Sequence, residues 1–294
     1  MVNVVTGAFG YIGKYITRRL LESGERVCTI TTHMNKPNPF GSAVQAFPYD
    51  FDKPDRLTES LQGAGVLYNT YWIRFEYGTL TFQKAVENTK ILLACARRAG
   101  LQKIVHISVT CASPTSSLPY YAGKGLQEIA VAESRIPYSI VRPTLVFGAE
   151  DILVNNIAWL IRTFPAFPIF GSGNYRVQPV FVEDLARIAI ASASQATSAP
   201  IDAIGPESFT FKEMVQLIAS KIKPTVKLIH VPPSLGIVLG NLIGFALRDR
   251  LLTRDELKGL MDELLTSVQI PNGTTRFSDW IDSNKATVGK RYSS

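Results

Sequence analysis

The sequence predicts an α/β protein with a doubly wound parallel sheet and a smaller C-terminal α/β lobe. Two observations lead to this fold class. Strand-like apolar runs alternate with amphipathic helical segments over the first half of the 294 residues, and a glycine-rich turn follows the first run. The strand-like runs are apolar throughout, which is typical of parallel strands covered on both faces. A chain of this length can bury one large core, or one core and a smaller lobe.

The first thirty residues predict a strand, turn, helix and strand in that order. Residues 2–5 and 27–30 are β-rich, and Ile12, Ile16 and Leu20 recur on one helical face between them. This is the layout of a βαβ unit that binds a dinucleotide, so we expect a Rossmann-type domain.

Three glycines in the turn support a cofactor site. Gly7 permits a tight turn, Gly10 lets the backbone approach a pyrophosphate, and Gly13 lets the helix pack closely on the strand. The helix N-terminus then faces the phosphates. Because glycines also mark ordinary turns, the prediction depends on the flanking strands and helix. The expected contacts of the turn are Gly7, Phe9, Gly10, Tyr11, Ile12 and Gly13.

Later elements continue the alternation as far as Pro143. Strands are predicted at 65–69, 103–108 and 138–142, and helices at 57–61, 82–99 and 123–134. Beyond that point prolines and glycines crowd residues 164–179, and an isolated strand is predicted at 226–231. We therefore predict an NAD(P)-binding domain at 1–150, to which 177–193 return, and a smaller substrate-side lobe at 151–294.

Composition limits the partners. The net charge of +7 favours anionic partners, but the basic residues are scattered without a run, so a small anionic substrate is expected and nucleic acid is not. Three widely spaced cysteines without a CxxC pair, and three histidines, argue against a metal site and for a reducing compartment.

The longest apolar run, SLGIVLGNLIGFAL at 234–247, is too short to cross a bilayer. We expect a buried or interface helix there, and contact with a membrane surface is the less favoured alternative. Because the first strand begins at once, we expect no signal or transit peptide and a cytoplasmic protein.

The end of the second strand favours NADP over NAD. Residues 27–46 contain no Asp or Glu, whereas an NAD-selective site usually places a carboxylate there. Hydroxyl, imidazole and ammonium groups suit a 2′-phosphate, although strand propensity also explains the threonines and NAD stays possible. The expected 2′-phosphate contacts are Thr31, Thr32, His33 and Lys36.

A second group of contacts is expected at residues 49–52, which follow a short strand candidate. Asp50 could accept a hydrogen bond from the adenine amino group while the neighbouring backbone at Phe51 donates to the ring. Alternatively, Asp52 or Asp55 caps the helix through 57–61. Both interpretations can hold together.

These motifs together resemble the short-chain dehydrogenase/reductase superfamily, in its extended or atypical branch. TGAFGYIG at 6–13 resembles TGxxGxxG, and YYAGK at 120–124 matches YxxxK. RPTLVFG at 142–148 resembles RPxxxxG, and VEDLA at 182–186 resembles VxDxA. The C-terminal part is more similar to atypical members, including nucleotide-sugar epimerase-like proteins and the NADPH-binding accessory subunit of respiratory complex I.

The resemblance implies hydride transfer. Tyr120 would act as acid or base, while Lys124, one helical turn away, would lower the pKa of the phenol and bind the nicotinamide ribose. The further cofactor contacts that the resemblance implies are Asn69, Thr70, Tyr71, Ile107, Ser108, Pro143, Thr144 and Leu145.

Two positions depart from the family pattern. Val109 occupies the place of the Ser or Thr that polarises the substrate carbonyl, so Thr110 or, less favoured, Ser108 would have to substitute. Ala85 occupies the place of the asparagine of NxxGT. These departures favour a second hypothesis, a non-catalytic NAD(P)-binding sensor or accessory subunit.

The leading hypothesis from the sequence is an NADP-dependent oxidoreductase or epimerase-like enzyme for a small carbonyl or sugar-nucleotide substrate. Trp72 and Arg74 follow the strand at 65–69, and Arg176 lies near a position where sugar-nucleotide enzymes hold a phosphate. These are the expected substrate contacts, and core aromatics with solvated arginines are the alternative. Related proteins often dimerise through the helices corresponding to 82–99 and 123–134, so a homodimer is possible.

Overall fold

The computed structural model describes residues 1–32, 34–195, 199–234 and 253–293. The chain divides into two compact units. The first unit contains Met1–Pro143 and Val182–Ala203, and the second contains Thr144–Phe181 and Ile204–Ser294. The division expected from the sequence lay at residue 150, with 177–193 as the returning segment.

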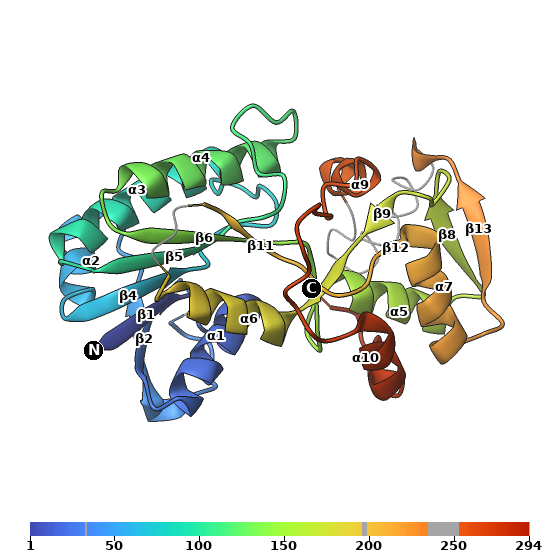
Figure 1. Ribbon diagram of the computed structural model, residues 1–294, viewed down its shortest axis with the longest axis horizontal. Helices are drawn as coiled ribbons and strands as arrows, with labels where there is room; N and C mark the ends of the chain where they lie inside the picture. Colours follow the sequence, from blue (N-terminus) through green and yellow to red (C-terminus); the bar gives the residue numbers. More distant parts are fainter. Residues whose placement is uncertain (33, 196–198, 235–252, 294) are drawn as a thin grey trace. The chain divides into compact units, whose positions relative to one another are not determined.

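A seven-stranded sheet forms the first unit, in the order β11-β6-β5-β4-β1-β2-β3 (Figure 1). All of its pairings are parallel. This arrangement confirms the predicted α/β fold class. The strands are β1 (Val2–Thr6), β2 (Arg26–Thr31), β3 (Val44–Pro48), β4 (Ala64–Asn69), β5 (Lys103–Ile107), β6 (Tyr138–Pro143) and β11 (Ile201–Ala203).

Helices cover both faces of this sheet. Figure 1 shows α1 (Tyr11–Glu22) and α6 (Val182–Ser192) on one face. The opposite face carries α2 (Pro54–Ser60), α3 (Phe82–Arg98) and α4 (Pro119–Glu133). Fully buried side chains join the second group of helices to the strands, among them Leu57, Leu67, Leu92, Ile104 and Val131.

The strand order reverses between β1 and β4. The chain adds β2 and β3 on one side of β1, and then returns to add β4, β5 and β6 on the other. The carboxyl ends of β1 and β4 therefore form the switch point at which open parallel sheets bind their ligands. Gly7 follows β1 and Thr70 follows β4 at this edge.

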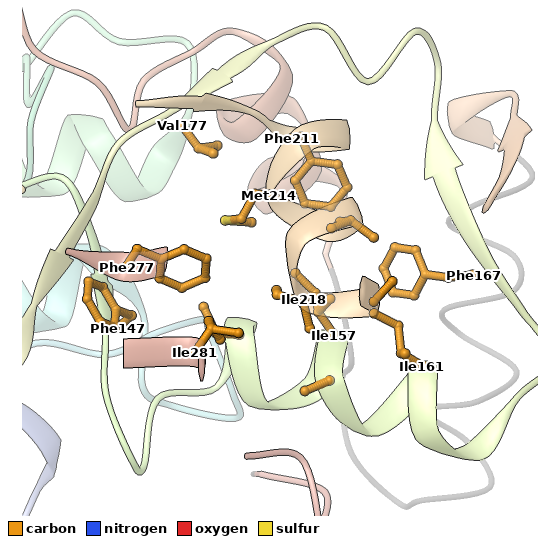
Figure 2. Packing of buried hydrophobic residues seen from close by; sticks show 14 of the residues in the cluster. Phe147, Ile157, Ile161, Phe167, Val177, Phe211, Met214, Ile218, Phe277 and Ile281 are labelled. Carbon is orange, nitrogen blue, oxygen red and sulfur yellow. The ribbon is translucent and has the colours of Figure 1, made fainter. Parts of the chain in front are cut away.

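Short strands and helices surround a separate core in the second unit. Among its described residues the helices are α5 (Leu153–Thr163), α7 (Phe211–Ile222), α9 (Arg254–Met261) and α10 (Phe277–Asn284). Figure 2 shows Phe147, Ile157, Phe211, Phe277 and Ile281 packed together in this core. The strand pairs are β7 (Leu145–Phe147) with β10 (Pro179–Phe181), β8 (Ala166–Phe170) with β13 (Lys227–Val231), and β9 (Arg176–Val177) with β12 (Phe209–Thr210).

Two helix starts differ from the sequence prediction. Helix α4 begins at Pro119 and not at residue 123, because the fixed φ of proline suits the first helical turn. Helix α2 begins at Pro54 after Lys53, and no side chain caps it. The predicted capping by Asp52 or Asp55 is therefore wrong, and Asp55 instead pairs with Arg98 at 2.5 Å.

The predicted apolar helix at 234–247 lies, except for Ser234, outside the described residues. None of the helices within residues 1–32, 34–195, 199–234 and 253–293 combines the length and the apolar character needed to cross a membrane. The same part of the chain contains no group of three or more His, Cys, Asp or Glu side chains arranged to hold a metal ion.

Candidate functional site

The turn after β1 requires glycine at two positions. Gly7 has φ +66° and its amide donates to the carbonyl of Ile30 at 2.8 Å, which fixes the turn to the end of β2. A Cβ atom at Gly13 would lie 2.3 Å from the Gly7 carbonyl oxygen, so helix α1 approaches the turn too closely for any side chain there. The turn therefore has the geometry that was predicted for a phosphate-binding loop.

The start of helix α1 suits an anion. Gly10 is its N-cap, is exposed, and has no side chain to cap the first turn. No acidic residue lies in that turn. Because the first amides of a helix have no intrahelical acceptor, they attract a phosphate group. The residues of this segment therefore fit the pyrophosphate of a dinucleotide.

Thr29 of β2 secures the turn from below. Its hydroxyl donates to the carbonyl of Val5 at 2.7 Å and accepts from the amide of Ala8 at 3.1 Å. This fully buried side chain thus holds the first residues of the turn against the sheet. No pattern in the sequence distinguishes Thr29 from the other threonines at the end of this strand.

Thr6 connects the loops that follow β1 and β4. Its hydroxyl accepts from the amide of Thr70 at 2.7 Å, and the Thr70 hydroxyl donates to the Thr6 carbonyl at 2.5 Å. The Asn69 side-chain oxygen accepts from the amide of Tyr71 at 3.1 Å. The predicted contacts Asn69, Thr70 and Tyr71 are therefore held at the switch point. Thr6 was the unassigned first residue of the TGxxGxxG match.

The residues predicted to contact a 2′-phosphate are not all exposed. Thr32 and Lys36 are exposed, whereas Thr31 has 2% of its surface accessible. Thr31 is the last residue of β2 and pairs with Pro48 of β3, so its side chain belongs to the interior. His33 lies outside the described residues.

The predicted adenine contacts follow β3. Asp50 has φ +23°, and its carbonyl accepts from the amide of Lys53 at 2.8 Å, which makes a tight turn. The Phe51 ring stacks on Tyr49 with 5.0 Å between centroids and lies 5.4 Å from Tyr71. This aromatic group links the segment after β3 to the loop after β4.

Tyr120 and Lys124 lie one turn apart on α4, as the sequence predicted. Tyr120 is half-buried, whereas Lys124 is 4% exposed and donates to the carbonyl of Ile107 at 2.9 Å. Burial lowers the pKa of the Lys124 ammonium to about 7, against the opposing effect of Glu128. Desolvation therefore opposes the charged form of Lys124, and this works against the effect on the Tyr120 phenol that the resemblance implied.

Both candidate carbonyl-polarising hydroxyls donate to protein acceptors. Ser108 Oγ donates to Glu128 at 2.5 Å, and Glu128 also forms a two-point ion pair with Arg142 at 2.8 and 2.5 Å. Thr110 is 1% exposed, and its hydroxyl donates to the carbonyl of Pro143 at 3.4 Å. Both hydroxyls are buried, and Val109 between them is apolar and also buried.

A buried polar network lies behind this region. The Asn69 amide and His106 Nδ1 are 3.1 Å apart, and desolvation lowers the pKa of His106 well below its usual value, so the imidazole is neutral. Gln127 donates to Thr89 Oγ1 at 2.6 Å. His106 and Gln127 were missed in the sequence analysis, although a histidine within an apolar strand was the available signal.

The predicted substrate residues lie in different units. Trp72 packs against Lys124, and the Arg74 guanidinium lies 5.7 Å from the Phe75 ring centroid, all in the first unit. Arg176 belongs to the second unit, is exposed, and donates to Ser208 Oγ at 3.0 Å.

The RPTLVFG segment contains three of the predicted cofactor contacts, and the chain passes from the first unit to the second within it. Pro143 ends β6 in the first unit, while Thr144 and Leu145 are buried in the second.

Curated relatives include subunits of respiratory complex I. NADH dehydrogenase [ubiquinone] 1 alpha subcomplex subunit 9, mitochondrial, from Arabidopsis thaliana is 24% identical over 244 residues, which cover 79% of this chain and 60% of the relative. The protein of the same name from Rattus norvegicus is 26% identical over 287 residues, with 92% and 74% covered. The chain thus spans about three fifths of the Arabidopsis relative. Because these relatives are named as mitochondrial, the prediction of a cytoplasmic protein is wrong.

Solved structures share the fold. Triphenylmethane reductase from Citrobacter sp. has a TM-score of 0.72 at 18% identity, covering 97% of this chain and 100% of the other. UDP-glucuronic acid 4-epimerase from Bacillus cereus, in complex with NAD, has a TM-score of 0.70 at 20% identity, covering 99% and 100%. At such identities the likeness concerns the fold alone.

A family model covers almost all of the first unit and also residues 144–181 of the second. The model of the NAD dependent epimerase/dehydratase family matches residues 3–204, which is more than half of the chain. The match includes the glycine turn, the switch point and the Tyr120–Lys124 pair described above. It confirms the resemblance found in the motifs, and the chain belongs to the NAD dependent epimerase/dehydratase family.

Proposed function

We propose that this chain is an NADP(H)-binding accessory protein that retains its dinucleotide as a structural or regulatory ligand. The observation that carries the proposal is a contrast within one site. The phosphate-binding turn has its glycines and its uncapped helix start, whereas the Ser108 and Thr110 hydroxyls are both engaged within the protein. The names of the curated relatives, which are complex I subunits, support an accessory role and protein partners.

The dinucleotide would lie across the carboxyl edge of the sheet. The amides at the start of α1 would bind the pyrophosphate, Asp50 would accept from the adenine, and Lys124 would bind the nicotinamide ribose. A bound nicotinamide supplies a hydride donor or acceptor. Tyr120 would lie beside the nicotinamide half, where its hydroxyl can hold or release a proton.

The preference for NADP over NAD follows from charge. Residues 27–46 provide no carboxylate to repel a 2′-phosphate, and Thr32 and Lys36 are exposed beside the end of β2. A hydroxyl and an ammonium are suitable donors to that phosphate.

A second candidate function is an oxidoreductase or epimerase of the Tyr-Lys type. The retained spacing of Tyr120 and Lys124 on α4 favours it. In that case a small carbonyl or sugar-nucleotide substrate would contact the side chains of Trp72 and Arg74 in the first unit.

Calorimetric titration of the purified protein with NADPH and, separately, NADH tests the proposal. We expect NADPH to bind at least about tenfold more tightly, which corresponds to about 1.4 kcal/mol. The Tyr120→Phe variant should bind NADPH with unchanged affinity. Absence of binding to well-folded protein would refute a dinucleotide site, and equal affinities would refute the NADP preference.

A further inference from the structure

Trp72 covers the ammonium of Lys124. The Lys124 nitrogen lies 4.9 Å from the centroid of the Trp72 ring and 2.9 Å from the carbonyl oxygen of Ile107. The indole comes from the loop after β4, whereas Lys124 belongs to α4, and both lie in the first unit. A lysine ammonium over an indole face is an attractive cation–π contact.

Gly123 makes room for this indole. A Cβ atom at position 123 would lie 2.5 Å from Cη2 and 3.1 Å from Cζ2 of Trp72. Trp72 also stacks on Phe82, with 5.4 Å between centroids and 15° between planes. The indole thus occupies a closely fitted slot between Phe82 and the first turns of α4.

The slot leaves one polar atom of Trp72 unsatisfied. Its Nε1 is buried without a hydrogen-bond partner among the described residues. A buried N–H without an acceptor carries a desolvation cost, so this position of the indole is stabilised by its ring contacts with Phe82 and Lys124 and opposed by its own polar atom. Such a balance favours a side chain that can be displaced.

We propose that Trp72 is a gate over Lys124, which the nicotinamide ribose of a bound dinucleotide must displace. This inference rests on the dinucleotide site of the proposed function. The adenosine and pyrophosphate half binds at the glycine turn without moving Trp72. The nicotinamide half can contact Lys124 only when the contact between Lys124 and the Trp72 indole is broken. Trp72 therefore reduces the affinity that the nicotinamide half adds.

Calorimetric titration with NADP+ and with 2′-phospho-ADP-ribose, which lacks the nicotinamide riboside, tests the gate. The wild-type chain should bind the two ligands with similar affinity. Trp72→Ala should bind NADP+ about tenfold more tightly and leave the affinity for 2′-phospho-ADP-ribose unchanged. Gly123→Ala, which pushes the indole from its slot, should shift the two affinities in the same way. Trp159→Ala, a matched substitution in the second unit, should change neither.

The outcomes separate the gate from the proposed function. If Trp72→Ala binds NADP+ with unchanged or weaker affinity while 2′-phospho-ADP-ribose still binds, the gate is refuted and the dinucleotide site stands. If neither ligand binds to the wild-type chain or to any variant, both proposals are refuted. If Trp72→Ala does not fold, Trp72→Phe is the milder variant, because its smaller ring can still stack on Phe82. A smaller gain in NADP+ affinity in Trp72→Phe supports the gate.

Discussion

The loop after β1 and the segment after β5 lie at the same edge of one sheet, yet they are built differently. In the first, Gly7 and Gly13 keep backbone amides close to the surface, and side chains from below hold the turn. In the second, the polar groups of Ser108 and Thr110 are directed to acceptors within the protein. The difference teaches that cofactor binding and carbonyl activation are separate properties of this fold, and that one can be kept without the other.

Gly13→Val should have the largest effect, because it destroys the first region of the comparison. A Cβ atom 2.3 Å from the Gly7 carbonyl oxygen forces the turn away from α1. We expect NADPH affinity to fall at least about 100-fold and the free energy of unfolding to fall by about 2–3 kcal/mol. Calorimetry and urea denaturation measure the two quantities. Ala94→Val, exposed on α3, is the matched control, and retained NADPH binding in Gly13→Val would contradict the account of the turn.

Lys124→Met should stabilise the protein in a pH-dependent way. The folded pKa of about 7 lies below the ordinary 10.5, so the unfolded chain takes up a proton on this group as the pH falls from 10.5 to 7, while the folded chain does not. The free energy of unfolding of the wild type therefore decreases as the pH falls through this window, by about 1.4 kcal/mol per pH unit. The gain from Lys124→Met should be a few kcal/mol, fully present near pH 6–7 and absent near pH 10.5.

Urea denaturation of both proteins between pH 6 and pH 10 measures the Lys124→Met difference. Lys90→Met, at an exposed position on α3, should show no such pH dependence. A gain that does not change with pH would mean that Lys124 is not desolvated as described.

Glu128→Gln should weaken the second region and leave the first intact. The change removes the negative charge and replaces one carboxylate oxygen by an amide NH2, so Arg142 loses its two-point ion pair, while the remaining amide oxygen can still accept from Ser108. Because the pair is largely buried, we expect the free energy of unfolding to fall by about 2–3 kcal/mol. NADPH affinity at the glycine turn should not change. Glu133→Gln, exposed on the same helix, serves as control, and a loss of NADPH affinity in Glu128→Gln would show that the two regions are coupled.

Lys36→Glu should have the smallest effect and sharpen the account of the first region. A carboxylate beside the end of β2 repels a 2′-phosphate, so NADPH affinity should fall about tenfold while NADH affinity is kept or rises. The ratio of the two dissociation constants, measured by calorimetry, is the readout. Lys90→Glu controls for the change in net charge. An unchanged ratio would remove Lys36 from the 2′-phosphate site.

The sequence predicted the βαβ order and the glycine turn because both depend on local patterns. Apolar runs, helical periodicity and the spacing of Gly7, Gly10 and Gly13 are readable within thirty residues. The seventh strand of the sheet, β11, has three residues and pairs with β6 alone, so no local sequence pattern predicts it.

Partners distant in sequence could not be predicted. Ser108 meets Glu128 across twenty positions, and this contact depends on where α4 begins. Thr31 is buried at the end of β2, where β3 pairs beside it, and this burial depends on segments distant in sequence. The prediction that Asp52 or Asp55 caps the helix was wrong, because the helix begins at Pro54 with Lys53 as its N-cap. Asp55 instead accepts a hydrogen bond from Arg98, which lies 43 residues away in sequence. The predicted cytoplasmic location also failed, since only the relatives bear on it.

The most direct test of the central claim is whether the protein oxidises bound NADPH. A panel of small aldehydes, ketones and nucleotide-sugar keto compounds is added to NADPH with a stoichiometric amount of wild-type or Tyr120→Phe protein. The absorbance of NADPH is then followed. The account predicts that both proteins bind NADPH equally and that neither oxidises it faster than a protein-free control. Rapid oxidation by the wild type that Tyr120→Phe lowers about 100-fold or more would contradict the account and establish the Tyr-Lys enzyme.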